Sequence, residues 1–542
     1  MMNIRKFFKV RNYYLLLGVI MINVGCTKNF LEYNTNPNEA TDEMTDWDNV
    51  RTGSLLLQME QNVLVVAQPG LNIGSDRYQT VEVMGGDGYV GYFGFPAPSI
   101  NSAGRYNWDK RSWYGDMFTT NYLTTMNAWR EIRKAINNDE DPRFSMAQIL
   151  KVAAMHRVTD TYGPIPYLNF GVSKEVPYDS QKDVYYRFFE ELDGAINNLD
   201  SYAASGSKVL SSWDCVFNGD VTSWIKFANS LKLRMAIRIR YADATLAEQM
   251  VKEAISTENG QVGVMENNDD NAFMKVSLNP FYTIFGWGDS RIGADLLTYM
   301  NAYEDPRRSV YALKSTFAGS SITNGYHGLR IGNEHTAVDA KMYSNMNVAA
   351  TAPLMWMNAA EVMFLRAEAA LLGWDTKDTP ENYYKAGIRL SFEENNISSG
   401  VESYLANTGK VEGYKDPLKG QSGQTYDYSG SINTTVTVAW AGGDFEKSLE
   451  QIITQKWIAN FPNGMESWSE YRRTGYPKLM PMAANASSGI VDDTEGARRM
   501  PYPTDEYREN KESVEAAVST LTQESKTKKG DSMATHVWWD CK

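Results

Sequence analysis

Cysteine and histidine are scarce in this sequence. Its 542 residues include three cysteines and four histidines. Three cysteines in a chain of this length cannot form a disulfide framework. His327 and His335 lie close in sequence but have no obvious third ligand, so we predict no zinc site. His156 lies in a helical pattern of apolar residues and is predicted to be a core histidine.

Basic residues are fewer than acidic ones, and the common catalytic motifs are absent. Lys and Arg total 53 against 66 Asp and Glu, a net charge of −13. A surface this acidic repels phosphate backbones, which argues against a nucleic-acid binder. The sequence contains no GxxxxGK[ST], GxGxxG, HExxH or GxSxG motif. Glycosidase carboxylates have no fixed spacing, so a glycoside hydrolase stays open. No cofactor is predicted; calcium lacks a supporting motif, and Asn267–Asp270 is interpreted as a turn.

Long hydrophobic runs are absent after the N-terminus. The most apolar later segment, Thr351–Trp374, contains Glu361, Arg366 and Glu368. Residues 1–12 carry four positive charges and no acid, and residues 13–25 are apolar and end directly before Cys26. This pattern is typical of a secretory signal and is too short to span a bilayer comfortably.

The residues around Cys26 resemble a bacterial lipobox, in which the cysteine thiol is acylated and becomes the new N-terminus. Asn23 departs from that pattern, because leucine is usual there. The alternative is a plain secretory signal with an incidental cysteine. We therefore predict a signal peptide at 1–25, a lipidated Cys26 with a polar tether at 26–45, and a folded domain at 46–542. Cys215 and Cys541 either pair or are both buried thiols.

Helical periodicity dominates the rest of the chain. Apolar residues recur with helical spacing in Tyr185–Leu199, from Trp224 to Ile239 and from Leu449 to Phe461. Basic residues alternate with the second stripe, and we expect a solvated face or internal ion pairs rather than an anionic partner: Lys226, Lys232, Arg234, Arg238 and Arg240. Strand signals are few, with a small hairpin predicted at Thr434–Trp440. The predicted fold is mainly α with minor β hairpins.

The stretch from Asn358 to Phe392 predicts a pair of helices. Asn358 and Glu361 resemble a capping box before an Ala-rich helix that stops at Gly373. Thr379-Pro380 then supplies an N-cap with proline at the first helical position. Two helices within about 34 residues match the size of a tetratricopeptide unit. No other segment clearly repeats this one.

Aromatic residues are abundant, with 14 Trp, 32 Tyr and 20 Phe. Many lie in predicted long loops at 85–113, 279–287, 317–347 and 401–444. A tyrosine or tryptophan ring combines an apolar face with a hydrogen-bonding edge, which suits sugar rings and also peptides. The candidate ligand-binding residues are therefore loop aromatics: Tyr89, Tyr92, Tyr106, Trp108, Trp113, Tyr282, Trp287 and Tyr326.

Seven stretches follow one another in a characteristic order over the whole mature chain. They are CTKNFLEYNTNPNEAT (26–41), HRVTDTYGPIPY (156–167), WIKFANSLKLRMAIRI (224–239), NAAEVMFLRAEAALLGW (358–374), TQKWIANFPNGMESWSEYRRTGYPKL (454–479), RRMPYPTDEYRENKESVEAA (498–517) and THVWWD (535–540). Together they resemble the SusD/RagB family of nutrient-binding outer-membrane lipoproteins of Bacteroidetes. We interpret Asp160, Tyr162 and 164–167 as residues that fix a helix end.

The resemblance implies a helical fold with about four tetratricopeptide-like helix pairs and long aromatic-rich ligand loops. It implies a lipoprotein anchored in the outer membrane, facing the exterior, that binds oligosaccharides without cleaving them. It also implies delivery to a SusC-like TonB-dependent transporter. Oligopeptide capture for the same type of transporter is the alternative function, and a surface glycoside hydrolase is a third. The family does not fix the ligand residues, so the candidates above are chosen on chemistry alone.

Overall fold

The structure is a computed structural model that describes residues 49–66, 74–96, 98–108, 112–172, 175–317, 322–420, 423, 425–429, 432 and 434–542. The predicted signal peptide, Cys26 and the tether lie outside these residues. The chain divides into two units, Met1–Thr52 and Gly53–Lys542, and the second contains the core. No helix among the described residues is long and apolar enough to cross a membrane.

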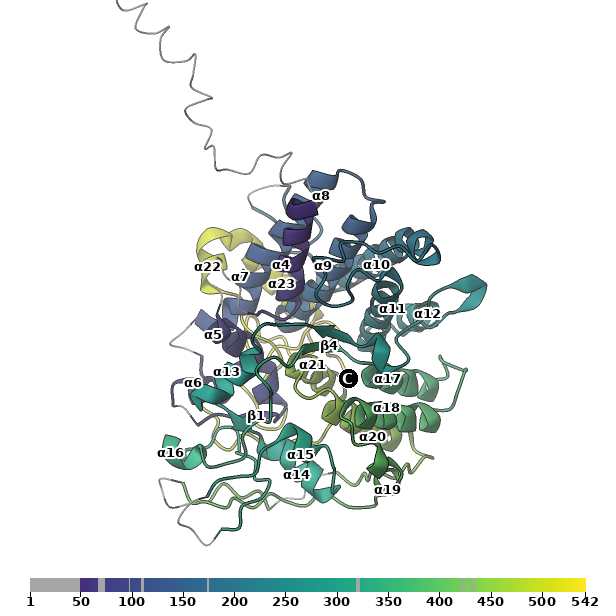
Figure 1. Ribbon diagram of the computed structural model, residues 1–542. Helices are drawn as coiled ribbons and strands as arrows, with labels where there is room; N and C mark the ends of the chain where they lie inside the picture. The colour runs from purple at the N-terminus through teal and green to yellow at the C-terminus, as the bar shows by residue number, and fades with distance from the viewer. Residues whose placement is uncertain are drawn as a thin grey trace, which may run out of the picture. The chain divides into compact units, whose positions relative to one another are not determined.

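Helices make up most of the regular structure, as predicted (Figure 1). They are α4 (Val50–Val63), α5 (Ser75–Tyr78), α6 (Pro98–Gly104), α7 (Asp116–Asn121), α8 (Asn127–Ile136), α9 (Pro142–Tyr162), α10 (Gln181–Ala204), α11 (Val221–Arg238), α12 (Ala244–Ala254), α13 (Pro280–Trp287), α14 (Ala294–Ala302), α15 (Arg308–Tyr311), α16 (Ala337–Ala340), α17 (Ala359–Leu371), α18 (Pro380–Glu394), α19 (Val401–Leu405), α20 (Phe445–Ala459), α21 (Gly464–Thr474), α22 (Thr504–Glu509) and α23 (Lys511–Glu524). Short 3-10 or π segments are η2 (Gln79–Asp87), η3 (Ser112–Gly115), η4 (Tyr122–Met126), η5 (Glu258–Gly260), η6 (Asn268–Asp270) and η7 (Ser398–Gly400).

Consecutive helices pack against each other in several places, and α17 with α18 is the clearest pair. The Asn358 side chain caps α17 by accepting the Glu361 N–H at 2.8 Å, and Thr379 caps α18. The predicted box is only half formed, because the Glu361 carboxylate turns to Arg234. Gly387 allows the helices to approach, since a Cβ there would lie 2.8 Å from the Phe364 ring.

Four short strands form two antiparallel ladders rather than local hairpins. β1 (Phe93–Gly94) pairs with β3 (Arg291–Ile292), and β2 (Ala272–Met274) pairs with β4 (Leu354–Met357). The hairpin prediction for residues 434–440 is wrong, because this segment contains no strand. Side chains of α18 and α20 form hydrogen bonds with its backbone instead. The Tyr384 hydroxyl of α18 donates to Val438 O, and Gln451 Nε2 of α20 donates to Thr437 O.

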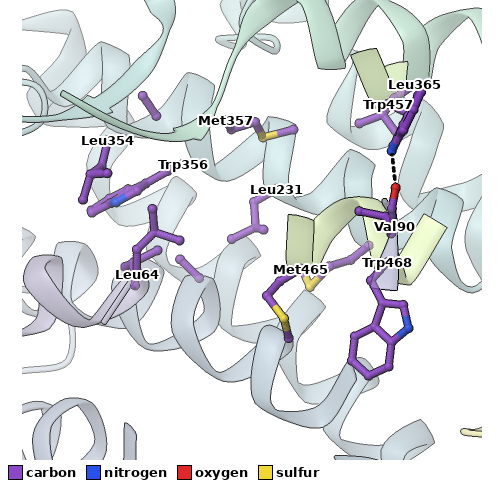
Figure 2. Packing of buried hydrophobic residues seen from close by; sticks show 14 of the residues in the cluster. Leu64, Val90, Leu231, Leu354, Trp356, Met357, Leu365, Trp457, Met465 and Trp468 are labelled. Carbon is purple, nitrogen blue, oxygen red and sulfur yellow. Dashed lines mark hydrogen bonds between the residues drawn. The ribbon is translucent and has the colours of Figure 1, made fainter. Parts of the chain in front are cut away.

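The core is rich in indole and methionine side chains. Trp356, Met357, Trp457, Met465 and Trp468 all pack in it (Figure 2). The indole nitrogens of Trp457 and Trp468 are hydrogen bonded, as most buried polar groups are. Trp457 Nε1 donates to Val90 O at 3.1 Å, and Trp468 Nε1 donates to Ala497 O at 2.9 Å. These bonds connect α20 to Val90 and α21 to Ala497.

The basic residues of α11 and Arg240, just beyond its end, form ion pairs with acidic side chains of other segments. Arg234 donates to Glu361 at 2.8 Å, and Arg240 Nε lies 2.6 Å from Glu368. The other pairs are at comparable distances: Lys226 with Asp270, Lys232 with Asp193 and Glu253, and Arg238 with Glu466 and Glu470. The prediction of internal ion pairs is confirmed, and the alternative of a solvated face is wrong.

Candidate ligand-binding site

Four of the eight predicted ligand residues are buried. Tyr89, Tyr92, Tyr106 and Trp108 are at most 8% exposed. The Tyr92 hydroxyl donates to Trp457 O and lies 2.8 Å from the Ser467 hydroxyl. Trp108 Nε1 donates to the Tyr89 hydroxyl at 2.8 Å. The polar edges of Tyr92 and Trp108 are therefore used within the protein.

The physical reason lies in the glycines among which these aromatics stand. A Cβ on Gly86 would lie 2.6 Å from the Met465 backbone, and a Cβ on Gly464 would lie 2.4 Å from the Asp87 Cα. The two glycines thus allow η2 and α21 to pack closely, and Gly86 lies in a helical segment of what is predicted to be a loop at 85–113. This close approach draws the aromatics of residues 85–113 into the core.

Two predicted residues, Tyr282 and Trp287, are exposed on α13. Their exposed fractions are 50% and 44%. Residues 279–287 were predicted to be a loop, but Asn279 Oδ1 accepts the Phe281 N–H at 2.9 Å and begins a helix with Pro280 at its first position. The other face of α13 is buried through Phe281, Ile284 and Phe285. Packing on that face therefore holds the exposed rings outward.

The face of α13 that carries the two rings has open space between them. Gly286 is exposed, and a Cβ there would meet no described atom within 4 Å. Lys341 Nζ lies 3.5 Å from the carbonyl oxygen of Trp287, which places an ammonium group beside that end of the helix. α5 lies beside α13 (Figure 1). Tyr78 of α5 makes an edge-to-face contact with Phe281 of α13. Two ring faces with an adjacent cation are thus available to a ligand.

The last two predicted residues lie elsewhere. Trp113 is partly buried and packs against the core from η3. Tyr326 lines a separate cleft of about 310 Å³, together with Asn301, Lys410 and Tyr414. The Arg308 guanidinium lies 5.4 Å from the centre of its ring. Of the eight predicted residues, Tyr282 and Trp287 are therefore the two with large exposed fractions, and both lie on α13.

Tyr428 and Tyr471 line a cleft but are not among the eight predicted ligand residues. Both are partly exposed and line a cleft of about 360 Å³ whose lining also includes the buried Tyr89 and Tyr106. Tyr471 lies in the 454–479 stretch that carries the family resemblance, and Tyr428 lies in the predicted long loop at 401–444. No local signal distinguishes either residue from its neighbours.

His156 and His335 are buried and hydrogen bonded, and Cys215 and Cys541 form no disulfide. His156 is buried and bonds to Val152 O at 3.1 Å, which confirms it as a core histidine. His335 lies 2.9 Å from the buried Asp416 carboxylate. Cys215 and Cys541 are both free, and Cys541 is exposed, so neither predicted alternative holds for the pair.

Residues 267–270 form the predicted turn. Asp270 accepts backbone N–H groups of its own turn and pairs with Lys226. In the described part of the chain, no group of three or more His, Cys, Asp or Glu side chains is placed to hold a metal ion.

The sequence matches the SusD-like family, described as "Susd and RagB outer membrane lipoprotein", over residues 32–540. The chain belongs to this family. It is similar to a SusD homologue from Bacteroides ovatus, with 48% identity, a TM-score of 0.81, and coverage of 92% of this chain and 100% of the homologue. It is also similar to a chitin-binding SusD homologue from Flavobacterium johnsoniae, with 34% identity, a TM-score of 0.81, and coverage of 90% and 98%. No curated protein matches the chain.

The helical fold expected of a SusD-like protein is confirmed by these structures. A second Bacteroides relative, from B. thetaiotaomicron, has 39% identity, a TM-score of 0.82, and coverage of 91% of this chain and 99% of its own. The motif residues Asp160 and Tyr162 have the structural role expected of them. α9 ends at Tyr162, and the buried Asp160 accepts a hydrogen bond from Trp539 Nε1 at 2.8 Å.

Proposed function

We propose that this SusD-like protein binds oligosaccharides on the α13 face without cleaving them. The observation that carries the proposal is the outward position of Tyr282 and Trp287, with Gly286 leaving space between them. A sugar ring can place its C–H face on an aromatic ring and direct its hydroxyls to polar groups at the edge. The chitin-binding relative supports a sugar as the ligand class.

The proposal includes delivery of the bound glycan to a SusC-like TonB-dependent transporter. A lipid on Cys26 would keep the domain at the outer surface of the outer membrane, next to such a transporter. The family description as an outer-membrane lipoprotein supports this location. Non-catalytic binding fits the role, because a protein that hands its ligand to a transporter must release it intact. The missing catalytic signatures also favour it.

The test is calorimetry of the full chain, in detergent, against neutral oligosaccharides and a mixed oligopeptide pool. Chito-, malto- and cello-oligosaccharides are the first probes, and each sample is analysed by mass afterwards. We expect one glycan class to bind and to be recovered intact. Binding of the peptide pool alone would favour oligopeptide capture, and recovery of shortened glycans would favour a glycoside hydrolase.

A further inference from the structure

The cleft beside Tyr428 and Tyr471 has a different position and lining from the α13 face. Its volume is about 360 Å³, within the range of small-molecule sites. Lys478 and Asp493 line it together with these two rings. The cleft therefore offers two ring faces, an ammonium donor and a carboxylate acceptor to one small ligand.

One wall of the cleft, the backbone of residues 478–482, is fixed from behind by buried side chains. The buried Asp295 carboxylate accepts the Met480 N–H at 2.7 Å. The Tyr299 hydroxyl donates to Lys478 O at 2.7 Å. Arg330 donates to Pro481 O from the same side. Because these three hydrogen bonds already hold the backbone at residues 478, 480 and 481, a ligand need not order this wall when it binds.

The opposite wall, residues 494–498, is held in the same way by α21. Trp468 Nε1 donates to Ala497 O at 2.9 Å, and Arg472 Nη1 donates to Arg498 O at 2.8 Å. The Tyr471 hydroxyl donates to Thr494 O at 3.3 Å, which orients its ring at the edge of the cleft. Both walls are thus built on buried hydrogen bonds of the core.

Arg330 contacts the ring of Tyr428 as well as the wall at residues 478–482. Its guanidinium donates to Tyr426 O at 3.1 Å and lies 5.8 Å from the centre of the Tyr428 ring. The backbone N–H of Tyr428 donates to Tyr414 O at 3.0 Å. One buried arginine therefore contacts both the segment with Tyr428 and the wall with Pro481.

The charges of the cleft select the ligand. Asp493 and Glu495 are exposed and line the cleft together with Lys478, while Arg498 is paired with the buried Asp540. Asp493 accepts from Asn485 Nδ2 at 2.7 Å, and Glu495 lies 3.4 Å from His536 Nε2. Acidic groups outnumber the unpaired cations, so an anionic ligand is repelled. The rings and the hydrogen-bonding groups instead match a neutral sugar.

We propose that this cleft is a second binding site, for one or two rings of a neutral oligosaccharide, separate from α13. The ligand class rests on the proposed function, whereas the position of the site does not. The consequence is that the protein binds about two equivalents of a short neutral glycan, one at each site.

The test uses the full chain and the double variant Tyr282→Ala/Trp287→Ala, which removes the rings of α13. Calorimetry is run with N,N′-diacetylchitobiose, cellobiose and maltose, and with digalacturonic acid as the anionic counterpart. We expect the double variant to retain about one equivalent of a neutral disaccharide and to ignore digalacturonic acid. Adding Tyr428→Ala should weaken the remaining binding about tenfold or more, while Tyr428→Phe, which keeps the ring, should change it less than about threefold.

The outcomes separate this inference from the proposed function. If the wild-type chain binds a neutral disaccharide but the α13 double variant does not, the second site is wrong and the proposed function stands. If Tyr428→Ala has no effect in a variant that still unfolds at the wild-type temperature, the second site is also wrong. If no glycan binds the wild-type chain, both proposals fail together. Preferred binding of digalacturonic acid at the cleft would overturn the assigned ligand class.

Discussion

Arg238 and Glu466 meet in the interior, where Arg238 Nη2 lies 2.6 Å from both carboxylate oxygens. Burial alone would raise the pKa of Glu466, but Arg238, Arg234 and Lys456 outweigh it and lower the pKa to about 2. The pair joins α11 to α21, two helices whose sequences are more than 200 residues apart. The alternating basic residues of α11 therefore hold the helical body together.

Replacing Glu466 with Gln should destabilise the protein by about 3–5 kcal/mol, because buried cations lose their counter-charge. The control is Glu381→Gln, which breaks the exposed pair with Lys385 and should cost about 0.5 kcal/mol or less. Urea unfolding followed by circular dichroism measures both. Equal midpoints for the two variants would contradict the role of the buried network.

The same pair gives a pH dependence with a defined sign. The pKa of Glu466 is lower in the folded state, so the folded state binds fewer protons than the unfolded state between about pH 4.5 and 2. The stabilisation is complete above about pH 4.5 and is lost as the pH falls through that window. Wild type and Glu466→Gln should therefore converge in stability on acidification. A gap that widens below pH 4 would contradict this assignment.

Gly387→Ala should destabilise the α17–α18 pair. The new methyl group would lie 2.8 Å from the Phe364 ring, and overpacking of this kind costs about 1–3 kcal/mol. Gly194→Ala on α10 is the matched control, because its Cβ would meet no described atom within 4 Å. That change should stabilise by about 0.5–1 kcal/mol through helix propensity. Thermal unfolding checks both, and stabilisation by Gly387→Ala would show that the helices do not cross there.

Asp295→Asn should remove a pH dependence of the opposite sign. Burial raises the pKa of Asp295 to about 6, so the folded state binds more protons than the unfolded state between about pH 4 and 6. Wild-type stability from this group is greatest below that window and falls, by about 3 kcal/mol, as the pH rises through it. Asn keeps an oxygen for the Met480 N–H and cannot ionise. The free energy of unfolding of Asp295→Asn, relative to that of wild type, should therefore rise from pH 4 to 7. A constant difference between the two proteins would contradict the prediction.

Trp108→Ala should affect folding rather than ligand binding. The indole is buried and donates to the Tyr89 hydroxyl, so truncation should cost about 3–5 kcal/mol. Trp108→Phe keeps most of the packing and should cost less. Unfolding midpoints and glycan affinities are measured for both variants. A folded Trp108→Ala protein with wild-type stability and weaker glycan binding would return Trp108 to the ligand site.

Local sequence signals predicted the elements that depend on local interactions. The stripe of α10 and the caps of α17 and α18 follow from side-chain spacing and from Asn358 and Thr379. The same reasoning could have found α13, because Asn279-Pro280 repeats the Thr379-Pro380 signal. The aromatic content of the segment led us to interpret it as a loop.

What the sequence could not show depends on contacts between distant segments. Whether Trp108 is buried follows from the approach of Gly86 to Met465, residues with no shared local pattern. The pairing of Phe93 with Ile292 likewise has no local signature. Exposure of ligand residues is a property of the assembled fold: Tyr282 and Trp287 are exposed on α13, whereas Tyr89, Tyr106 and Tyr326 line clefts.

The central claim, glycan binding on α13, is tested most directly by the affinity of Tyr282→Ala and Trp287→Ala for the glycan that the wild-type chain binds. Trp287→Phe serves as the control that keeps a ring. We predict that each alanine variant weakens binding at the α13 site, measured with Tyr428→Ala as the background, about 5- to 30-fold at unchanged thermal stability, while the phenylalanine variant stays within about threefold. Wild-type affinity in both alanine variants would contradict the account.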